Sequence, residues 1–259
     1  MKKSVKVLII ILLIICIGAF LYAGYKLVSK QLEYRASAKT YESLAEEFVK
    51  TDNKEKKEDS DEIVLDPEVS PVNVDFDKLK AEYPDIVAWL YCPDTAINYP
   101  VCQYDDNAYY LNRLPNGNYN SGGTIFVDCL NQKNFSDTNT IIYGHHMNDG
   151  SMFAKLVDYS YQDYYDAHPV MYLNTPTYNY RIELFAGYVT SADALDTTYK
   201  ISFADEAEFD SVMAGIISQS KFTSDVKPVY GDKIITMSTC TYEYDNARFV
   251  AQGRMVAIH

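Results

Sequence analysis

The 259-residue sequence is poor in positive charge, with 23 Lys and Arg against 36 Asp and Glu and a net charge of -13. Its Lys and Arg residues do not cluster outside the N-terminal flank. A nucleic-acid-binding protein needs such a cluster to neutralise phosphates, so we expect no nucleic acid among the partners. The sequence also has no internal repeat and no glycine-rich loop of the kind that binds phosphate.

Cysteine is scarce too, with five in the chain and no Cys-x-x-Cys pair, which excludes the common zinc and redox motifs. No carboxylate spacing resembles a calcium-binding loop, so we predict no metal and no other cofactor. Cys16 lies in an apolar run. Four cysteines remain for the folded part: Cys92, Cys102, Cys129 and Cys240. Cys92 and Cys102 flank a predicted turn, and the sequence leaves a disulfide between them open.

A single long apolar run stands near the N-terminus. Residues 7–25 contain no charged side chain, and a helix of this length crosses the hydrocarbon core of a bilayer. A cleaved signal peptide is the alternative, but its candidate site, Ala36-Ser37-Ala38, lies well beyond the apolar run. We expect residues 1–6 to be cytoplasmic and residues 7–28 to be a retained single-pass anchor. Lysines flank both sides of the run, and we expect the large C-terminal part to be extracellular.

The composition changes after the anchor. Residues 31–50 place apolar positions among charges, which predicts a juxtamembrane helix, whereas residues 51–62 are almost all Asp, Glu, Lys, Asn and Ser. Such a polar stretch buries too little apolar surface to fold, so we interpret it as a tether. We therefore assign residues 29–74 to a juxtamembrane helix and linker. One catalytic domain, residues 75–259, follows and opens with a short helix that stops at Pro84.

Short β-patterned runs dominate this domain. Eight of them are separated by turn residues: 86–91, 97–103, 123–128, 138–143, 170–174, 178–190, 233–240 and 248–258. Eight such runs predict a mainly β fold, closed or nearly closed into a barrel. Helical spacing predicts three interruptions, at residues 106–113, 151–159 and 205–220, the last within the connection between strands six and seven.

The clearest candidate for chemistry is Cys240, at the end of the apolar run 234–240. Residues two apart share a strand face, so Thr236, Ser238 and Cys240 point one way and Thr239 the other. A cysteine at the end of a rigid strand can be held at the edge of an open cleft. A small core residue fits the same pattern equally well.

Histidine is the natural partner of a cysteine nucleophile, and the chain has four. His145 ends another apolar run, after Gly144, and an imidazole can accept a thiol proton and later protonate a leaving amine. The adjacent His146 leaves open which of the two faces the thiol. We interpret His168 and His259 as structural.

Arg248 is the third candidate. It follows Cys240 by eight residues, which allows a turn through Asp245-Asn246 and an antiparallel return to the thiol, where a guanidinium can stabilise an oxyanion. The competitor is Arg254, six residues further along, which we expect to form a structural ion pair.

These segments resemble the class B sortases, which are cysteine transpeptidases of Gram-positive bacteria. The resemblance covers about residues 75–259 and rests on five segments: Ile142-Tyr143-Gly144-His145, Gly150-Ser151-Met152-Phe153, Met237-Ser238-Thr239-Cys240, Asp245-Asn246-Ala247-Arg248-Phe249-Val250, and Ala88 to Val101. The long connection before the Cys240 strand resembles class B more than the shorter class A enzymes. Met237 replaces a Leu that is usual in the family, a conservative change.

The resemblance implies an eight-stranded sortase barrel with N-terminal helices, in which Cys240 attacks the Thr carbonyl of a C-terminal sorting motif in a secreted protein. It selects His145 over His146 as the acid and base, and Arg248 as the oxyanion stabiliser. Ser238 and Thr239 would line the motif-binding groove. The acyl group would pass to an amine of peptidoglycan or of its lipid-linked precursor at the outer face of the membrane.

Three alternatives remain open on the sequence. A hydrolytic cysteine peptidase would use the same side chains and let water resolve the acyl-enzyme. A membrane-anchored binding module would have no activity. A pilus-polymerising sortase is disfavoured, because Asp66-Pro67-Glu68 lacks the aromatic residue of its lid segment.

Overall fold

The computed structural model describes residues 3–51, 55–56, 63–64, 68–241 and 243–258. The chain divides into two compact units, Met1–Thr40 and Tyr41–His259. Most of the predicted tether at residues 51–62, and also His259, lie outside the described residues.

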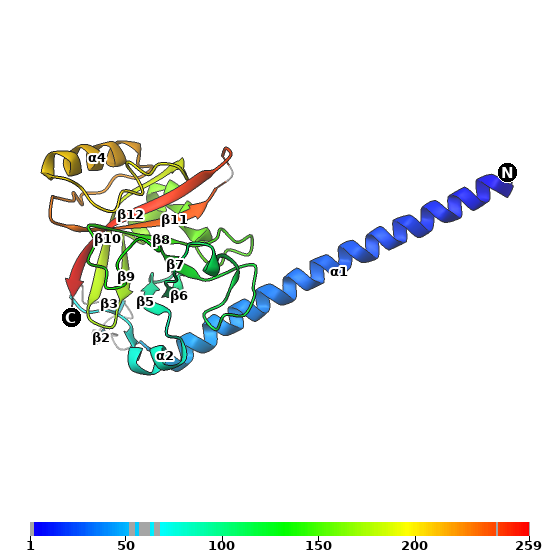
Figure 1. Cartoon of the computed structure of the whole chain (residues 1–259), viewed down its shortest axis with the longest axis horizontal. Helices are drawn as coiled ribbons and strands as arrows, with labels where there is room; N and C mark the ends of the chain where they lie inside the picture. Colours follow the sequence, from blue (N-terminus) through cyan, green and yellow to red (C-terminus); the bar gives the residue numbers. More distant parts are fainter. Residues whose placement is uncertain (1–2, 52–54, 57–62, 65–67, 242, 259) are drawn as a thin grey trace. The chain divides into compact units, whose positions relative to one another are not determined.

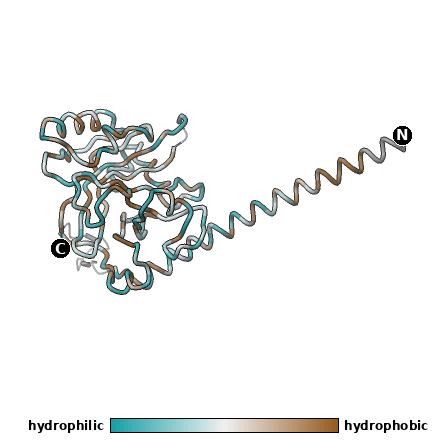
Figure 2. The backbone as a smooth tube through the Cα atoms, in the orientation of Figure 1, coloured by the Kyte–Doolittle hydropathy of each residue, from teal (hydrophilic) through white to brown (hydrophobic). Residues whose placement is uncertain are grey.

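The first unit is the greater part of helix α1 (Lys3–Phe48). This helix continues without a break through the predicted anchor and the predicted juxtamembrane helix, because no proline interrupts that stretch. Its Ile9–Phe48 stretch is long and apolar enough to cross a membrane, by length and composition alone, and a signal sequence also has these properties. Figure 2 shows the hydrophobic colour concentrated in the first half of the helix.

The second unit is built on a closed eight-stranded barrel (Figure 1). Its strands are β5 (Ile86–Tyr91), β6 (Asn98–Cys102), β7 (Ile125–Val127), β8 (Asn139–Tyr143), β9 (Val170–Asn174), β10 (Asn179–Ser191), β11 (Lys233–Cys240) and β12 (Ala247–Ile258). Around the barrel the order is β10-β12-β11-β8-β7-β6-β5-β9. Each strand falls on one of the eight predicted runs, so the predicted mainly β barrel is confirmed.

Short elements join and flank the strands. They are β1 (Val49–Lys50), β2 (Glu55–Lys56), β3 (Ile63–Val64), β4 (Asn73–Val74), α2 (Phe76–Glu82), η1 (Tyr109–Asn112), η2 (Ala154–Ser160), α3 (Gln162–Ala167) and α4 (Glu206–Gln219). The sequence did not predict α3 or the pairs β1–β4 and β2–β3, and the two 3-10 helices η1 and η2 are shorter than the predicted helical patches. Helix α4 lies in the connection between the sixth and seventh barrel strands, as predicted.

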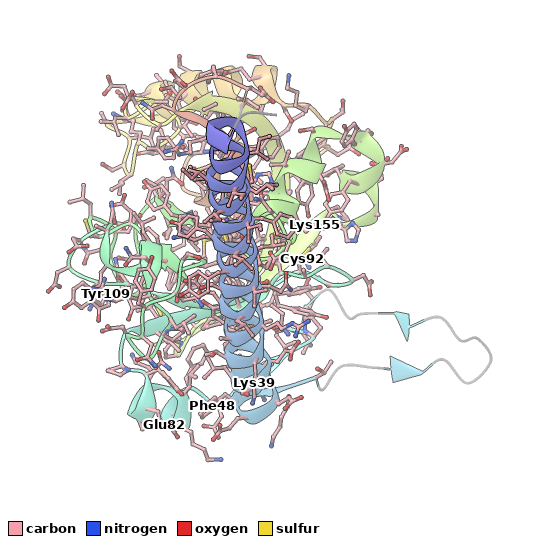
Figure 3. All side chains as sticks on the ribbon, turned by 90° about the vertical axis from the view of Figure 1, so that its right-hand side faces the viewer. Lys39, Phe48, Glu82, Cys92, Tyr109 and Lys155 are labelled. Carbon is pink, nitrogen blue, oxygen red and sulfur yellow. The ribbon has the colours of Figure 1, made fainter. Side chains whose placement is uncertain are left out.

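The last turns of α1 belong to the second unit and are packed into it. Tyr41, Leu44 and Phe48 are all buried. The Phe48 and Tyr83 rings form a T-shaped pair with centroids 6.3 Å apart, and Tyr83 directly follows Glu82, the last residue of α2. Phe48 and Glu82 are both labelled in Figure 3. The end of α1 is therefore a structural part of the barrel unit.

The connection between β10 and β11 adds an apolar layer to the outside of the barrel. Phe209, Met213 and Ile216 of α4 form a buried cluster with Ile234 of β11 and Val250 of β12. Side chains alternate along a strand, so the face of β11 that carries Ile234 also carries residues 236, 238 and 240. The connection thus provides a wall beside the end of β11.

Candidate active site

A pocket of about 210 Å³ lies at the end of β11. The residues that line it come from the loop after β6, from η1, from β7, β8, β11 and β12, and from the connection after β10: Asn107, Leu111, Phe126, Tyr143, Gly144, His145, Ala192, Tyr199, Ser238, Thr239, Cys240 and Arg248. The pocket contains all five residues that the sequence singled out, and brings together segments more than 100 residues apart in the chain.

The hairpin of β11 and β12 places Arg248 opposite the cysteine. Cys240 and Arg248 are direct partners in the antiparallel register, where the Cβ atoms of opposite residues lie about 5 Å apart. The turn between them uses Asn246 at φ 62°, and Ala247 N donates to Tyr244 O at 3.1 Å. The predicted antiparallel return is confirmed, and it puts the guanidinium and the thiol at the same end of the barrel.

His145 reaches the pocket because β8 runs parallel to β11. The ladder continues past the strand end, where Gly144 N donates to Ser238 O at 3.1 Å. The His145 Nε2 atom lies 2.6 Å from the backbone oxygen of Leu111. A carbonyl oxygen can only accept, so Nε2 carries the proton, and in the neutral ring Nδ1 is the basic nitrogen.

The turn that carries His145 is held from behind by Phe153. This fully buried residue donates its backbone N–H to His145 O at 2.9 Å. A Cβ atom on Gly144 would lie only 2.7 Å from the Phe153 ring. Glycine is therefore required at this position by the close approach of the ring.

The two other described histidines have structural roles. His146 Nδ1 lies 3.0 Å from Cys240 O and so bonds to the backbone of the cysteine, while the pocket lining contains the neighbouring His145. His168 Nδ1 lies 3.1 Å from Tyr164 O, and the two rings stack with centroids 4.5 Å apart. The geometry thus favours His145, as the resemblance implied.

Ser238 and Thr239 both line the pocket, in different ways. The Ser238 hydroxyl is 2.9 Å from the Tyr199 hydroxyl, and both residues are buried. Burial raises the pKa of the Tyr199 phenol, although the Ser238 hydrogen bond and the Arg248 charge oppose this. The Thr239 hydroxyl is buried and has no hydrogen-bond partner among the described residues. Sequence patterns missed Tyr199, because it lies in an irregular part of the long connection.

The other cysteines of the barrel unit are poor nucleophiles. Burial raises the pKa of the Cys92 thiol to about 11, and that of Cys102 further. Burial and the Asp128 carboxylate raise the pKa of Cys129. Cys92 and Cys102 are free thiols at opposite ends of the β5–β6 hairpin, so they do not form the disulfide that the sequence left open.

Arg254 is occupied elsewhere. Its guanidinium bonds to the Glu183 carboxylate on β10, with an Nη2 to Oε2 distance of 2.5 Å. Arg181 also bonds to Glu183, at 2.8 Å. The predicted structural ion pair is confirmed.

Comparison with known proteins agrees with this geometry. The sortase domain model matches residues 90–256, well over half of the chain. The chain belongs to the sortase family. Sortase B of Listeria monocytogenes is 36% identical over 247 residues, covering 95% of each chain, and sortase B of Staphylococcus aureus is 28% identical over 260 residues, covering 100% of this chain and 99% of the other.

Solved structures place this sortase in class B. A Staphylococcus aureus sortase B-substrate complex matches with a TM-score of 0.67 and 30% identity, over 71% of this chain and 85% of that one. A Bacillus anthracis sortase B in complex with AAEK1 matches with a TM-score of 0.71 and 29% identity, over 87% of this chain and 99% of that one. The protein is thus a cysteine transpeptidase of a family that acts at the cell surface on sorting-motif substrates and cell-wall amines.

Proposed function

We propose that Cys240 is the nucleophile of this sortase, that His145 is its acid and base, and that Arg248 stabilises the oxyanion. The observation that carries the proposal is the convergence of the three side chains in one pocket, from the ends of three neighbouring strands. Among the cysteines of the barrel unit, Cys240 lines this pocket, and Cys92, Cys102 and Cys129 do not.

The reaction has two halves. The Cys240 thiolate adds to the carbonyl carbon of the sorting-motif Thr, and the negative charge that develops on the oxygen faces the guanidinium of Arg248. His145 then gives a proton to the leaving amine, and the acyl-enzyme remains. In the second half the incoming amine loses its proton to His145 and attacks the thioester, which releases the Cys240 thiolate and leaves His145 protonated, as at the start.

The substrates follow from the family and its relatives. We propose a C-terminal sorting motif cleaved after Thr, bound along Ser238 and Thr239, and an amine of peptidoglycan or its lipid-linked precursor as the acceptor. Two solved sortase B structures support these assignments. One is in complex with a substrate, which supports the peptide substrate, and one is in complex with triglycine, which supports an amine acceptor.

The same proposal covers the cellular arrangement. Residues 1–6 are cytoplasmic, residues 7–28 cross the membrane once, and residues 29–74 link the anchor to an extracellular catalytic domain at residues 75–259. The apolar first half of α1 supports this arrangement, which brings the enzyme to the membrane face where both substrates arrive.

Mass spectrometry of reaction products tests the function. The full chain in detergent is incubated with a panel of sorting-motif peptides and triglycine, beside Cys240→Ala, His145→Gln and the control His168→Gln. We expect cleavage after Thr with a triglycine adduct, lost in the Cys240 and His145 variants and kept in the His168 control. Cleavage to the free acid with every amine tried would favour a hydrolytic peptidase, and no Cys240-dependent product would favour a binding module.

A further inference from the structure

The end of helix α1 contacts the barrel through the hydroxyl of Tyr41. This residue is buried, and its hydroxyl donates to the backbone oxygen of Gly123 at 2.5 Å and lies 3.2 Å from the Thr124 hydroxyl. The Tyr41 and Tyr99 rings form a T-shaped pair with centroids 5.2 Å apart. Tyr41 therefore touches two separate segments, the strand β6 and the loop before β7.

The contact of Tyr41 with Gly123 and Thr124 is connected to the His145 ring through the backbone of η1. Gly123 packs directly on the backbone of η1, since a Cβ atom there would lie 2.6 Å from Leu111 O. Thr124 fixes the same segment, because its hydroxyl donates to Arg113 O at 2.7 Å. Leu111 O is the atom that accepts from His145 Nε2. A single close contact, between Gly123 and Leu111, thus separates the hydrogen bond of Tyr41 from Leu111 O, the atom that sets the tautomer of His145.

The contact of Tyr41 with Tyr99 is connected to the backbone of His145 through Met152 and Phe153. The Tyr99 hydroxyl accepts a hydrogen bond from Met152 N at 3.2 Å. Met152 has a positive φ of 55° and is followed by Phe153, whose N–H bonds to His145 O. The ring and the backbone of His145 are therefore both held by segments that rest on Tyr41.

We propose that Tyr41 is a positioning residue for His145, so that the end of the N-terminal helix is part of the catalytic apparatus. This inference rests on the proposed role of His145. Tyr41 is not among the residues that line the pocket, and its effect on the reaction passes through the orientation of the imidazole. Removing its hydroxyl then changes the proton-transfer steps and leaves peptide binding unchanged.

Tyr41→Phe tests this, with Tyr159→Phe as the matched control. Tyr159 is another buried tyrosine whose hydroxyl donates to a backbone oxygen, that of His168 at 2.8 Å. In the full chain in detergent we expect Tyr41→Phe to lower kcat about three- to tenfold, the effect of one lost hydrogen bond, with the KM for the peptide unchanged. Thr124→Val removes a bond from the same path and replaces Tyr41→Phe if that variant does not fold.

A spectroscopic readout keeps the inference separate from the proposed function. Long-range ¹H–¹⁵N spectra of the histidine-labelled chain report the tautomer and titration midpoint of His145, identified through His145→Gln. We expect both to move in Tyr41→Phe and to stay in Tyr159→Phe. An unchanged His145 signal and kcat, or equal changes in the control, would overturn the inference. A wild-type chain without Cys240-dependent product would refute the proposed function, while the spectra would still decide the role of Tyr41.

Discussion

Replacing Gly144 by alanine tests how tightly the turn that carries His145 is packed. The new Cβ atom would lie 2.7 and 2.8 Å from two ring carbons of Phe153, whereas carbon atoms in contact prefer about 3.5 to 4.0 Å. Phe153 is fully buried, so its ring cannot turn out into solvent. Relief of the overlap therefore requires a relative displacement of about 1 Å between the ring and the turn.

Two effects of different size follow from this displacement. Overpacking of this kind costs about 1–3 kcal/mol, and a domain of this size loses about 2–4 °C of Tm per kcal/mol. We thus expect Tm to fall by about 2–12 °C. Two backbone hydrogen bonds fix this turn, since Gly144 N donates to Ser238 O and His145 O accepts from Phe153 N. A shift of about 1 Å in a catalytic group can lower the rate about 100-fold, so we expect kcat/KM to fall at least about tenfold.

Thermal unfolding and initial rates of triglycine-adduct formation measure the two effects separately. Gly215→Ala is the matched control, because nothing lies within 4 Å of a Cβ atom at this position of α4. Alanine in a helix interior is more stable than glycine by about 0.5–1 kcal/mol, so the control should unfold at the same or a higher temperature. Phe153→Leu in the Gly144→Ala background should restore part of the activity. A Gly144→Ala enzyme with wild-type Tm and rate would refute the packing argument.

Three further predictions concern charge and thiol reactivity. Arg248→Ala should lower kcat/KM by about 10²–10³-fold, the loss of one oxyanion donor, whereas Arg254→Ala should lower Tm and keep the rate; equal rates for both would remove Arg248 from the mechanism. Burial alone would raise the pKa of Glu183, but hydrogen bonds and charges from two arginines outweigh it and hold that pKa below its usual 4.5. Its stabilisation is present above about pH 4.5 and is lost as the pH falls through the depressed value, so the Tm advantage over Glu183→Gln should shrink below that pH, and a constant advantage would contradict it. Iodoacetamide should label the partly exposed Cys240 in the native chain and leave the buried Cys92 unmodified until the protein is unfolded; native labelling of Cys92 would show that its site opens.

The barrel could be predicted because its strands have local signals. Alternating apolar residues and turn residues located all eight strands, and the eight-residue spacing between Cys240 and Arg248 predicted their cross-strand pairing. The predicted anchor and the predicted juxtamembrane helix form one continuous helix, α1. No helix breaker stands between the two segments, so composition changed while the backbone conformation did not.

The residues that surround Cys240, His145 and Arg248 could not be predicted from local sequence patterns. Tyr199 lies in an irregular part of the long connection and Leu111 lies in the short helix η1, and both line the pocket together with strands far away in the sequence. The contact of Leu111 with His145 uses a backbone oxygen, which every residue has, so no residue type could mark it. Tyr41 was likewise hidden, because an aromatic residue in a helix next to a predicted membrane anchor has several ordinary explanations.

The parallel pairing of β8 with β11 is what makes the site possible. His145 follows the end of β8 and Cys240 ends β11, and the carboxyl ends of parallel strands meet at the same edge of a sheet. Had the two strands paired antiparallel, His145 would lie about 16 Å away, the length of a five-residue strand at about 3.3 Å per residue. The β11–β12 hairpin then needs only a tight turn to return Arg248 to the thiol. Two topological rules, one for parallel neighbours and one for hairpins, thus bring an imidazole, a thiol and a guanidinium to one edge of the barrel, where the long connection and η1 complete the pocket.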